Sequence, residues 1–552
     1  MAIGEAVPLL DAVDRVTGRV GYTANLVFPD MLYGKVLRSP LPHARIVSID
    51  ASAAEALPGV AAVVTRDDFA GGRLNALYGS GADQTIVALE HVRFIGEPVA
   101  LVAAESEAIA EEALSLIEVE YEELPAVFDV FEAMAEGAPL LHEGHPNNLL
   151  NHAKLRRGDV EAGFAEADLI VEETYTSPVA QQAMLEQQSA IGQWRDGRLT
   201  LWTASQSPFT VRRAVSGVLG VPPEDMRIVV PPLGGGFGGK GNVRTQPQVA
   251  ALAWKVGGRP VKLVLKRDEE FVTVTKHQAI LHLKSGVKRD GTFTARQIDV
   301  HWNAGAQASS SLHLVPAGML RSIGPYRIPN VKVDSYGVYT NLPAAAAYRG
   351  AMSSQGVWAH ESHMDSIAHA LGIDPLELRL KNLLRTGDSF ATGETIHEAY
   401  FAECLQAAAD GIGWSEPLER QPAPQIRRGR GLGVMMKNTI ATSRSECILE
   451  LDDEGRLTLY TSTVEMGQGA HTTLAQIAAD AVGLPLEAVT IVGPDTAITP
   501  YDTQTASSRG TYMMGNAVLK GAANLKAKLV EAAAPLLEEP AERLRADQGY
   551  VS

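Results

Sequence analysis

The sequence predicts an α+β protein in which an N-terminal unit is followed by two related domains. Three observations predict this class. The chain has 552 residues, more than one ordinary hydrophobic core accommodates, so two to four domains are expected. Short apolar strands alternate with helical segments near the N-terminus. A strand–helix–strand pattern also occurs twice, about 260 residues apart, which is too long a period for a solenoid.

Composition narrows the class of protein. The net charge of −17 argues against a nucleic-acid partner, because no basic stripe offsets phosphate repulsion. Only two cysteines occur, Cys404 and Cys447, which excludes a disulfide framework and an iron–sulfur cluster held by this chain alone. No apolar run nears membrane-spanning length. We therefore expect a cytoplasmic protein.

The N-terminal unit is predicted over residues 1–130. Alternating apolar residues predict strands at 34–38, 61–64 and 99–103, and an alanine-rich helix is predicted at 106–117.

The repeat defines the next two domains, predicted over residues 131–410 and 411–552. In each copy a Gly-Arg-Leu-Thr-Leu strand leads through a polar loop to a helix that ends in glycine and proline, and a second strand follows. The paired segments are 197–203 and 455–461, 211–219 and 472–482, and 227–230 and 489–492. Two related domains that clasp one ligand between them are the interpretation we favour.

A glycine loop at 232–240, Pro-Leu-Gly-Gly-Gly-Phe-Gly-Gly-Lys, lies between a strand and a predicted helix at 246–253. Such a loop is a common cradle for phosphate or pyrophosphate. A Walker loop is excluded, because Gly241 stands where a hydroxyl must bind magnesium. A nicotinamide or flavin fingerprint is disfavoured, because Pro231 and Pro232 separate the strand from the loop and Arg259 stands where an acid is expected.

Further motifs extend over the whole chain. They are residues 14–18, 38–44, 96–100, 202–208, 232–240, 324–330, 340–343, 347–350 and 465–469. In this order they closely resemble the molybdenum-binding subunit of the xanthine oxidase family of molybdopterin hydroxylases. The resemblance implies an N-terminal α/β-hammerhead domain, followed by two molybdopterin-binding domains.

The resemblance also implies site residues. Gln206 matches the glutamine that hydrogen-bonds an oxo ligand of the metal, Phe237 matches the loop beside the metal, and Arg349 matches the arginine near its ligands; we predict these three as catalytic. The implied cofactor contacts are Gln206, Gly236, Phe237, Gly238, Arg349, Met466, Gly467, Gln468, Gly469, Ser507, Ser508 and Thr511.

Three of these contacts have a second explanation. Ser507, Ser508 and Thr511 lie at or just inside the start of a predicted helix at 511–529. Helix capping and cofactor binding explain these residues equally well. The metal itself is held by the dithiolene of the pterin, so no protein metal ligand is implied. Histidines such as His277 and His301 are interpreted as structural.

The implied reaction is oxidation of an aldehyde, aromatic or N-heterocyclic substrate with water as the oxygen source. The cofactor is expected as molybdenum on molybdopterin, in its cytosine dinucleotide form. Electrons then leave to a [2Fe-2S] cluster and FAD on a small and a medium partner subunit. The sequence is closest in character to 4-hydroxybenzoyl-CoA reductase and to aldehyde and N-heterocycle dehydrogenases.

Particular positions argue against other substrates of the family. Purine-oxidising members have a glutamate and an arginine where this chain has Gly241 and Ala317. The carbon monoxide dehydrogenases place a cysteine close to the Tyr-Arg pair, where this chain has Gly350.

Family members continue beyond position 552 with a stretch that supplies the catalytic glutamate. We therefore expect the second molybdopterin-binding domain to be incomplete: either the sequence is truncated, or a further polypeptide carries the C-terminal part. Glu97 imitates the glutamate motif but belongs to the N-terminal pattern. The alternative function is a non-catalytic molybdopterin-binding or maturation protein.

Overall fold

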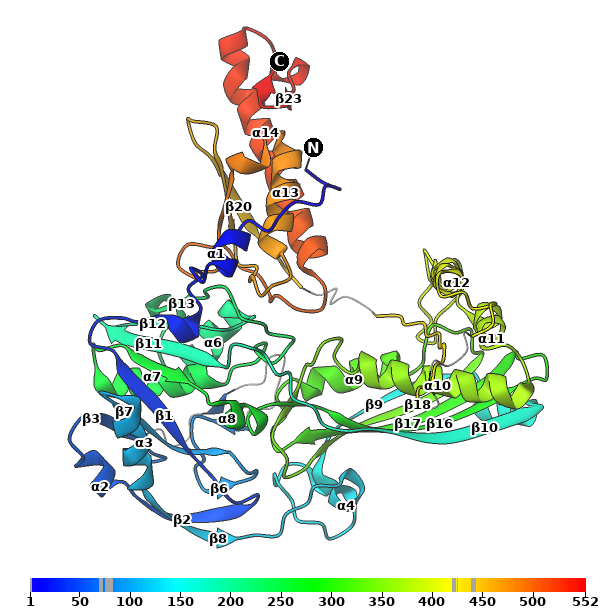
Figure 1. Ribbon diagram of the computed structural model, residues 1–552, viewed down its shortest axis with the longest axis horizontal. Helices are drawn as coiled ribbons and strands as arrows, with labels where there is room; N and C mark the ends of the chain where they lie inside the picture. The colour runs from blue at the N-terminus through cyan, green and yellow to red at the C-terminus, as the bar shows by residue number, and fades with distance from the viewer. Residues whose placement is uncertain (1, 69–72, 75–82, 419–422, 424, 438–442) are drawn as a thin grey trace.

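The computed structural model describes residues 2–68, 73–74, 83–418, 423, 425–437 and 443–552. Two sheets lie side by side in a broad body, and a module formed by the C-terminal residues rises from it (Figure 1). A small helical group stands on the far end of the body, beyond the second sheet.

The first sheet has seven strands in the order β13-β12-β11-β14-β1-β7-β3. Their bounds are β1 Leu32–Arg38, β3 Val60–Val64, β7 Pro98–Ala104, β11 Ser189–Arg195, β12 Arg198–Thr203, β13 Met226–Val229 and β14 Val261–Val264. β1 runs parallel to β14, with Leu32 opposite Val261. The N-terminal unit and the first repeat therefore share one sheet, and the predicted boundary near residue 130 separates segments that hydrogen-bond to one another.

Helix α7 (Thr245–Val256) packs on this shared sheet. Its residues 245–253 are all buried, including two glutamines, because the helix lies between the sheet and the rest of the body. Because a buried side-chain amide needs a hydrogen-bond partner, Gln246 donates to the Thr203 hydroxyl at 2.9 Å. The strands predicted near the N-terminus are all present, and the predicted helix is α3 (Glu107–Ser115), capped by the Ser106 hydroxyl.

The second sheet has five strands in the order β10-β16-β17-β18-β9 and has no counterpart in the sequence predictions. Its bounds are β9 Leu149–Arg157, β10 Leu169–Ser177, β16 Gln278–Val287, β17 Phe293–Gly305 and β18 Asn330–Tyr339. β17 and β18 run parallel, so the chain must cross over between them, and α9 (Ser311–Arg321) makes that crossover. α10 (Ser353–Leu371) packs beside α9, and α11 (Pro375–Asn382) and α12 (Phe401–Gly411) form the helical group at the far end.

The C-terminal module contains the second copy of the repeat, and the structure confirms the repeat. β12 leads through α6 (Pro208–Leu219) to β13, and β21 (Leu457–Thr461) leads through α13 (Ala470–Val482) to β22 (Val489–Val492). The two strands are parallel in both copies. β20 (Cys447–Leu451) completes the sheet of the module, and α14 (Gly515–Leu537) packs against α13.

The start of α14 differs from the prediction. A π-helical turn at Gly510–Met514 precedes it, and the α-helix then runs to Leu537 instead of ending at 529. At the opposite end of the chain, α1 (Ala12–Val16) lies against this module, where the Leu10 amide donates to the Thr472 hydroxyl at 3.0 Å.

The remaining short elements are α2 Ser52–Glu55, α4 Val130–Met134, α5 Val160–Ala165, α8 Arg267–Phe271, β2 Ala44–Asp50, β4 Arg73–Leu74, β5 Gln84–Thr85, β6 His91–Val92, β8 Glu118–Glu123, β15 Thr275–Lys276, β19 Ala345–Ala346, β23 Ala546–Asp547 and β24 Tyr550–Val551. Within the described ranges, no helix has both the length and the apolarity of a membrane span.

Candidate cofactor site

The glycine loop at 232–240 follows β13 and is tightly enclosed. Phe237 and Gly238 have φ angles of 51° and 101°, in the left-handed region. A Cβ atom at Gly238 would lie 2.5 Å from the Ala347 carbonyl oxygen, and one at Gly236 would lie 2.8 Å from Gln206 Oε1. Only glycine allows the backbone to approach its neighbours this closely at these two positions.

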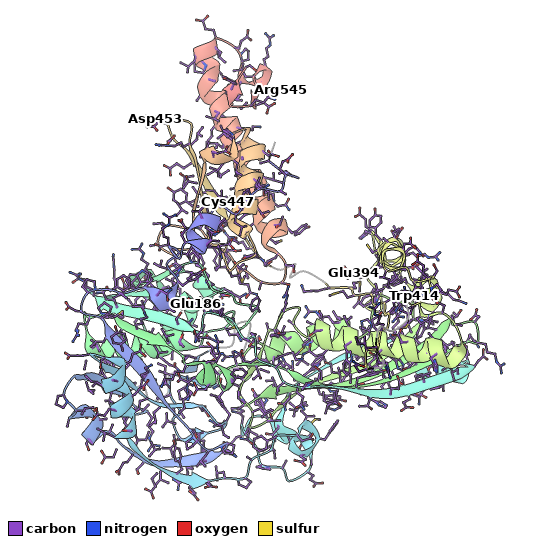
Figure 2. All side chains as sticks on the ribbon, viewed as in Figure 1. Glu186, Glu394, Trp414, Cys447, Asp453 and Arg545 are labelled. Atoms are coloured by element: carbon purple, nitrogen blue, oxygen red, sulfur yellow. The ribbon has the colours of Figure 1, made fainter. Side chains whose placement is uncertain are left out.

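A buried ion pair anchors the loop from behind. Lys240 Nζ lies 2.7 Å from Glu186 Oε2, which also accepts the Gly234 amide at 2.9 Å. Burial lowers the pKa of Lys240, against the opposing effect of the Glu186 carboxylate. The lysine that ends the loop therefore has a structural partner. The sequence gives no local signal for the pairing of Glu186 with Lys240, because 54 residues separate them. Figure 2 labels Glu186 in the body, near the base of the C-terminal module.

Gln206 joins the glycine loop to the C-terminal module. Its Oε1 accepts the Gly238 amide at 3.0 Å, and its Nε2 donates to the Thr505 carbonyl at 2.9 Å. The Thr505 amide returns a bond to the Gln206 carbonyl at 2.9 Å. Gln206 is only 3% exposed, so its neighbours fix the position of its side chain. A glutamine in an exposed surface loop would be free to move.

The second predicted loop, 465–469, lies directly against the first. The Leu233 amide donates to the Glu465 carbonyl at 2.9 Å, and Met466 Sδ lies 3.1 Å from the position that a Cβ of Gly236 would take. The two loops that we predicted to clasp one ligand are therefore adjacent.

Within that second loop, many polar groups are already partnered by the protein. The buried Glu465 carboxylate accepts the amides of Gly467 and Gly469 at 2.9 and 3.2 Å. Gln468 Nε2 donates to the Val464 carbonyl at 2.8 Å, so its side chain folds back on its own loop. These hydrogen bonds stabilise the loop and the start of α13. Because the groups that make them are already bonded, a cofactor must contact other atoms of the loop.

The segment that contains Arg349 lies on the Phe237 side of the glycine loop. The Arg349 amide donates to the Phe237 carbonyl at 2.9 Å, which brings the Tyr348-Arg349 pair beside the loop. The Arg349 residue itself is exposed, and among the described residues no carboxylate lies within ion-pair distance of it.

Ser507 and Ser508 form a turn just before the helix, near the predicted place at its start. Both have left-handed backbones, with φ angles of 57° and 56°. No side chain caps the π-helical turn, so capping does not explain the serines, and Thr511 lies exposed within that turn. Successive left-handed residues point their amides into one concavity, which suits an anion.

The arrangement fits a molybdopterin group. In the described part of the chain, the amides of Gly235, Gly236 and Phe237 donate to no protein acceptor, although their neighbours Gly234 and Gly238 do. The same loop carries the Phe237 ring, which is 43% exposed, a high exposure for a large aromatic side chain. Free amides next to a close backbone approach are what an oxo or phosphate oxygen requires.

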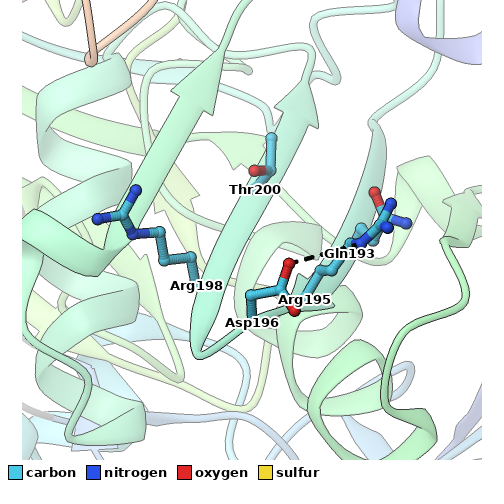
Figure 3. Close-up of a pocket in the computed structure, with 5 residues that line it drawn as sticks. All are labelled: Gln193, Arg195, Asp196, Arg198 and Thr200. Atoms are coloured by element: carbon cyan, nitrogen blue, oxygen red, sulfur yellow. Dashed lines mark ion pairs between the residues drawn. The ribbon is translucent and has the colours of Figure 1, made fainter.

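Other polar groups do not contribute to this site. A shallow hollow on the β11–β12 hairpin is lined by Gln193, Arg195, Asp196, Arg198 and Thr200 (Figure 3). It lies at the turn end of the hairpin, and its Arg195–Asp196 pair, 3.7 Å apart, is exposed. His277 is buried against the Ser311 hydroxyl, and burial lowers its pKa to about 3, so it is neutral.

Comparison with known proteins agrees with this geometry. The family described as aldehyde oxidase and xanthine dehydrogenase, a/b hammerhead domain, matches residues 17–125. The molybdopterin cofactor-binding domain families match residues 141–383 and 407–552. Together these matches span the hammerhead and both repeats.

Whole proteins align as well. A xanthine dehydrogenase molybdenum-binding subunit of Escherichia coli O157:H7 is 36% identical, over 98% of this chain and 74% of its own length. The nicotinate dehydrogenase large molybdopterin subunit of Eubacterium barkeri is 35% identical, over 73% of this chain and 94% of its own length. The crystal structure of quinoline 2-oxidoreductase from Pseudomonas putida 86 superposes with a TM-score of 0.92 at 30% identity, covering 100% of this chain and 74% of that one.

The hammerhead, the repeated domains, the paired loops and these relatives lead to one assignment: the chain belongs to the molybdopterin-binding subunits of the xanthine dehydrogenase family of oxidoreductases.

Proposed function

We propose that this subunit works in a multi-subunit hydroxylase or dehydrogenase that oxidises an aldehyde, aromatic or N-heterocyclic substrate with oxygen from water. The observation that carries the proposal is the junction at Gln206, where the glycine loop, the second loop and the turn at Ser507 meet around unpartnered amides. The names of several relatives support the N-heterocycles, since they include nicotinate dehydrogenase and nicotine 6-hydroxylase.

The cofactor is proposed in its cytosine dinucleotide form, and when bound it supplies two-electron redox chemistry at molybdenum. On the metal side we assign Gln206, Phe237 and Arg349, with the backbone of Gly236 and Gly238. We assign the pterin and pyrophosphate side to residues 466–469, Ser507, Ser508 and Thr511.

Each group on the metal side has a definite role in the proposal. Gln206 Nε2 has a second N–H besides the one that the Thr505 carbonyl accepts, and it offers this donor to an oxygen in front of the loop. Phe237 excludes water from one side of the reacting carbon. Arg349 places a positive charge, without a carboxylate partner among the described residues, where negative charge develops.

Partner subunits are part of the proposal. The two cysteines of the chain are free and cannot hold a cluster, so the electrons need other carriers. We assign these carriers to a small [2Fe-2S] subunit and a medium FAD-binding subunit.

Isotope labelling tests the reaction. The complex, purified with its partners, is incubated with N-heterocyclic and aldehyde substrates, an electron-accepting dye and water enriched in oxygen-18. The proposal predicts substrate-dependent dye reduction and oxygen-18 in the product. Product oxygen taken from molecular oxygen, or a metal-loaded complex that reduces no dye with any of these substrates, would contradict it.

A further inference from the structure

The N-terminal segment is fastened along the C-terminal module. The Ala2 amide donates to Asp480 Oδ1 at 2.5 Å, and Gln476 Nε2 donates to the Ala2 carbonyl at 2.7 Å. A further hydrogen bond, 3.0 Å long, joins the Leu10 amide to the first turn of α13. The end of a chain is ordered where contacts of this kind hold it. Residues 2–16 therefore form a fixed surface on the module, which we call the N-terminal strap.

The N-terminal strap also reaches the second loop, 465–469. Arg15 Nη2 lies 3.5 Å from Glu465 Oε1, the carboxylate oxygen that accepts two amides of this loop. Leu9 Cδ2 lies 2.9 Å from the position that a Cβ of Gly469 would take. These contacts place the strap against the loop that we assign to the pterin and pyrophosphate side of the cofactor. In Figure 1, α1 lies at the foot of the module, away from the helical group at the far end of the second sheet.

The outer surface of the strap is apolar. Aliphatic side chains that are close together in the chain are exposed there, namely Leu9, Leu10, Val13 and Val16. Val13 and Val16 are 63% and 85% exposed, and they share one face of α1 because they are three residues apart. Arg15 lies on another face, where it pairs with Asp11 and Glu465. Single exposed aliphatic side chains are common in proteins, but a group of them on a fixed surface marks an interaction site.

Electron transfer indicates what binds at this surface. The proposed oxidation releases two electrons, which pass one at a time to a [2Fe-2S] cluster and then to FAD. The two free cysteines of this chain cannot hold that cluster, so a partner must bring it. Because the rate of electron transfer falls steeply with distance, the cluster must dock where the cofactor lies close to the surface.

The two sides of the glycine loop have different tasks in the proposed function. The side of Phe237 and Arg349 is assigned to the substrate, which leaves the side of the second loop for the electrons. The tip of that loop, Gly467 and Gln468, is exposed, and the strap contacts the same loop at Gly469. We propose that the N-terminal strap is the docking surface for the small [2Fe-2S] subunit. The inference rests on the proposed function and adds the place at which that subunit binds.

Site-specific photocrosslinking identifies what binds. Benzoyl-phenylalanine takes the place of Val16 in the complex purified with its partners, and mass spectrometry identifies the protein that it attaches to. We expect the small [2Fe-2S] subunit. The control is the same group in place of Leu536, which is 83% exposed in the last turn of α14 and is expected to give no cross-link to that subunit. Cross-links from position 16 only to the FAD-binding subunit or to a second copy of this chain would overturn the inference, as would equal cross-links to the small subunit from both positions.

Paired substitutions measure what the strap contributes to binding. Val13→Ser with Val16→Ser is expected to weaken binding of the small subunit about tenfold or more, because two aliphatic side chains are no longer removed from water. Native mass spectrometry of the complex over a dilution series measures the dissociation constant. Leu536→Ser with Leu537→Ser removes two exposed aliphatic side chains at the far end of the module and is expected to leave the dissociation constant unchanged. An unchanged dissociation constant in the strap variant would overturn the inference.

Molybdenum content separates docking from a purely structural role of the strap. If the strap is a docking surface, its variant keeps the molybdenum of the unmodified complex and loses affinity for the small subunit. Loss of molybdenum with unchanged affinity would show that the strap only holds the second loop, and would overturn the inference. A complex that gives the expected cross-link but takes no oxygen from water would contradict the proposed reaction instead, and would leave the docking surface in place.

Discussion

At the residue scale, Gly238 sets how closely the glycine loop and the Tyr-Arg segment approach. A methyl group there would lie 2.5 Å from the Ala347 carbonyl, on a backbone with a φ angle of 101°. We expect Gly238→Ala to displace the loop and to lower molybdenum content and turnover by about tenfold or more, because sites that depend on loop position lose catalysis with small shifts.

The control for this substitution is Gly217→Ala, in the last turn of α6, where an added Cβ meets nothing within 4 Å. It is expected to stabilise the protein by about 0.5–1 kcal/mol and to leave the molybdenum content unchanged. Equal molybdenum contents in the two variants would show that the glycine loop does not hold the cofactor.

Glu97 makes stability depend on pH. Burial raises its pKa to about 7, from 4.5 in an unfolded chain. Between these values the folded protein retains a proton that the unfolded chain has lost, so the free energy of unfolding falls as pH rises, by roughly 3 kcal/mol in all. Glu97→Gln is expected to remove this fall, as measured by urea unfolding from pH 4 to pH 8.

Exposed Glu136→Gln is the control for the pH profile and is expected to keep the slope of the unmodified protein. An unchanged slope in Glu97→Gln would show that other groups cause it.

Resemblance placed Gln206, Phe237 and Arg349 at one site, and the contacts of the glycine loop join all three. The pairing of Glu186 with Lys240 escaped prediction because 54 residues separate the two in the chain. For the serines at 507 and 508 the sequence left capping and cofactor binding open; capping is removed by the left-handed backbone, which the sequence does not show.

At the element scale, the glycine loop depends on one buried ion pair. Lys240→Met leaves the Glu186 carboxylate buried without its partner, and we expect it to lower the free energy of unfolding by about 3–5 kcal/mol. Urea unfolding followed by circular dichroism measures the change. The double variant Lys240→Met/Glu186→Gln removes both charges and is expected to recover much of the loss; a single variant as stable as the unmodified protein would contradict an anchoring role.

Sequence periodicity predicted the elements whose apolar pattern is simple, such as β7 and α3. It missed the five-stranded sheet, whose long strands carry buried polar residues such as Arg296, Ser285 and Asp334 that break the alternation. Those residues are partnered across strands and helices, as Arg296 is by Ser285 and the Ile323 carbonyl, and partners of this kind depend on the tertiary fold.

At the scale of the whole molecule, the two repeats form one site because their edges meet. Val229 at the end of β13 bridges to Asp495 of the C-terminal module, and Arg227 pairs with Asp495 through both carboxylate oxygens at 3.0 Å. The internal repeat predicted the pair of domains. It contained no information about which strands of the two domains meet, such as the contact of β13 with the segment after β22.

The central claim is that the junction of the two loops holds a molybdopterin cofactor. Its most direct test is the molybdenum and pterin content of the chain purified with its partners, measured beside Gly238→Ala and Gly217→Ala. We predict stoichiometric molybdenum and pterin in the unmodified protein and in Gly217→Ala, and a loss of both in Gly238→Ala. A protein that carries neither molybdenum nor pterin, or a Gly238→Ala variant that retains both in full, would contradict the claim.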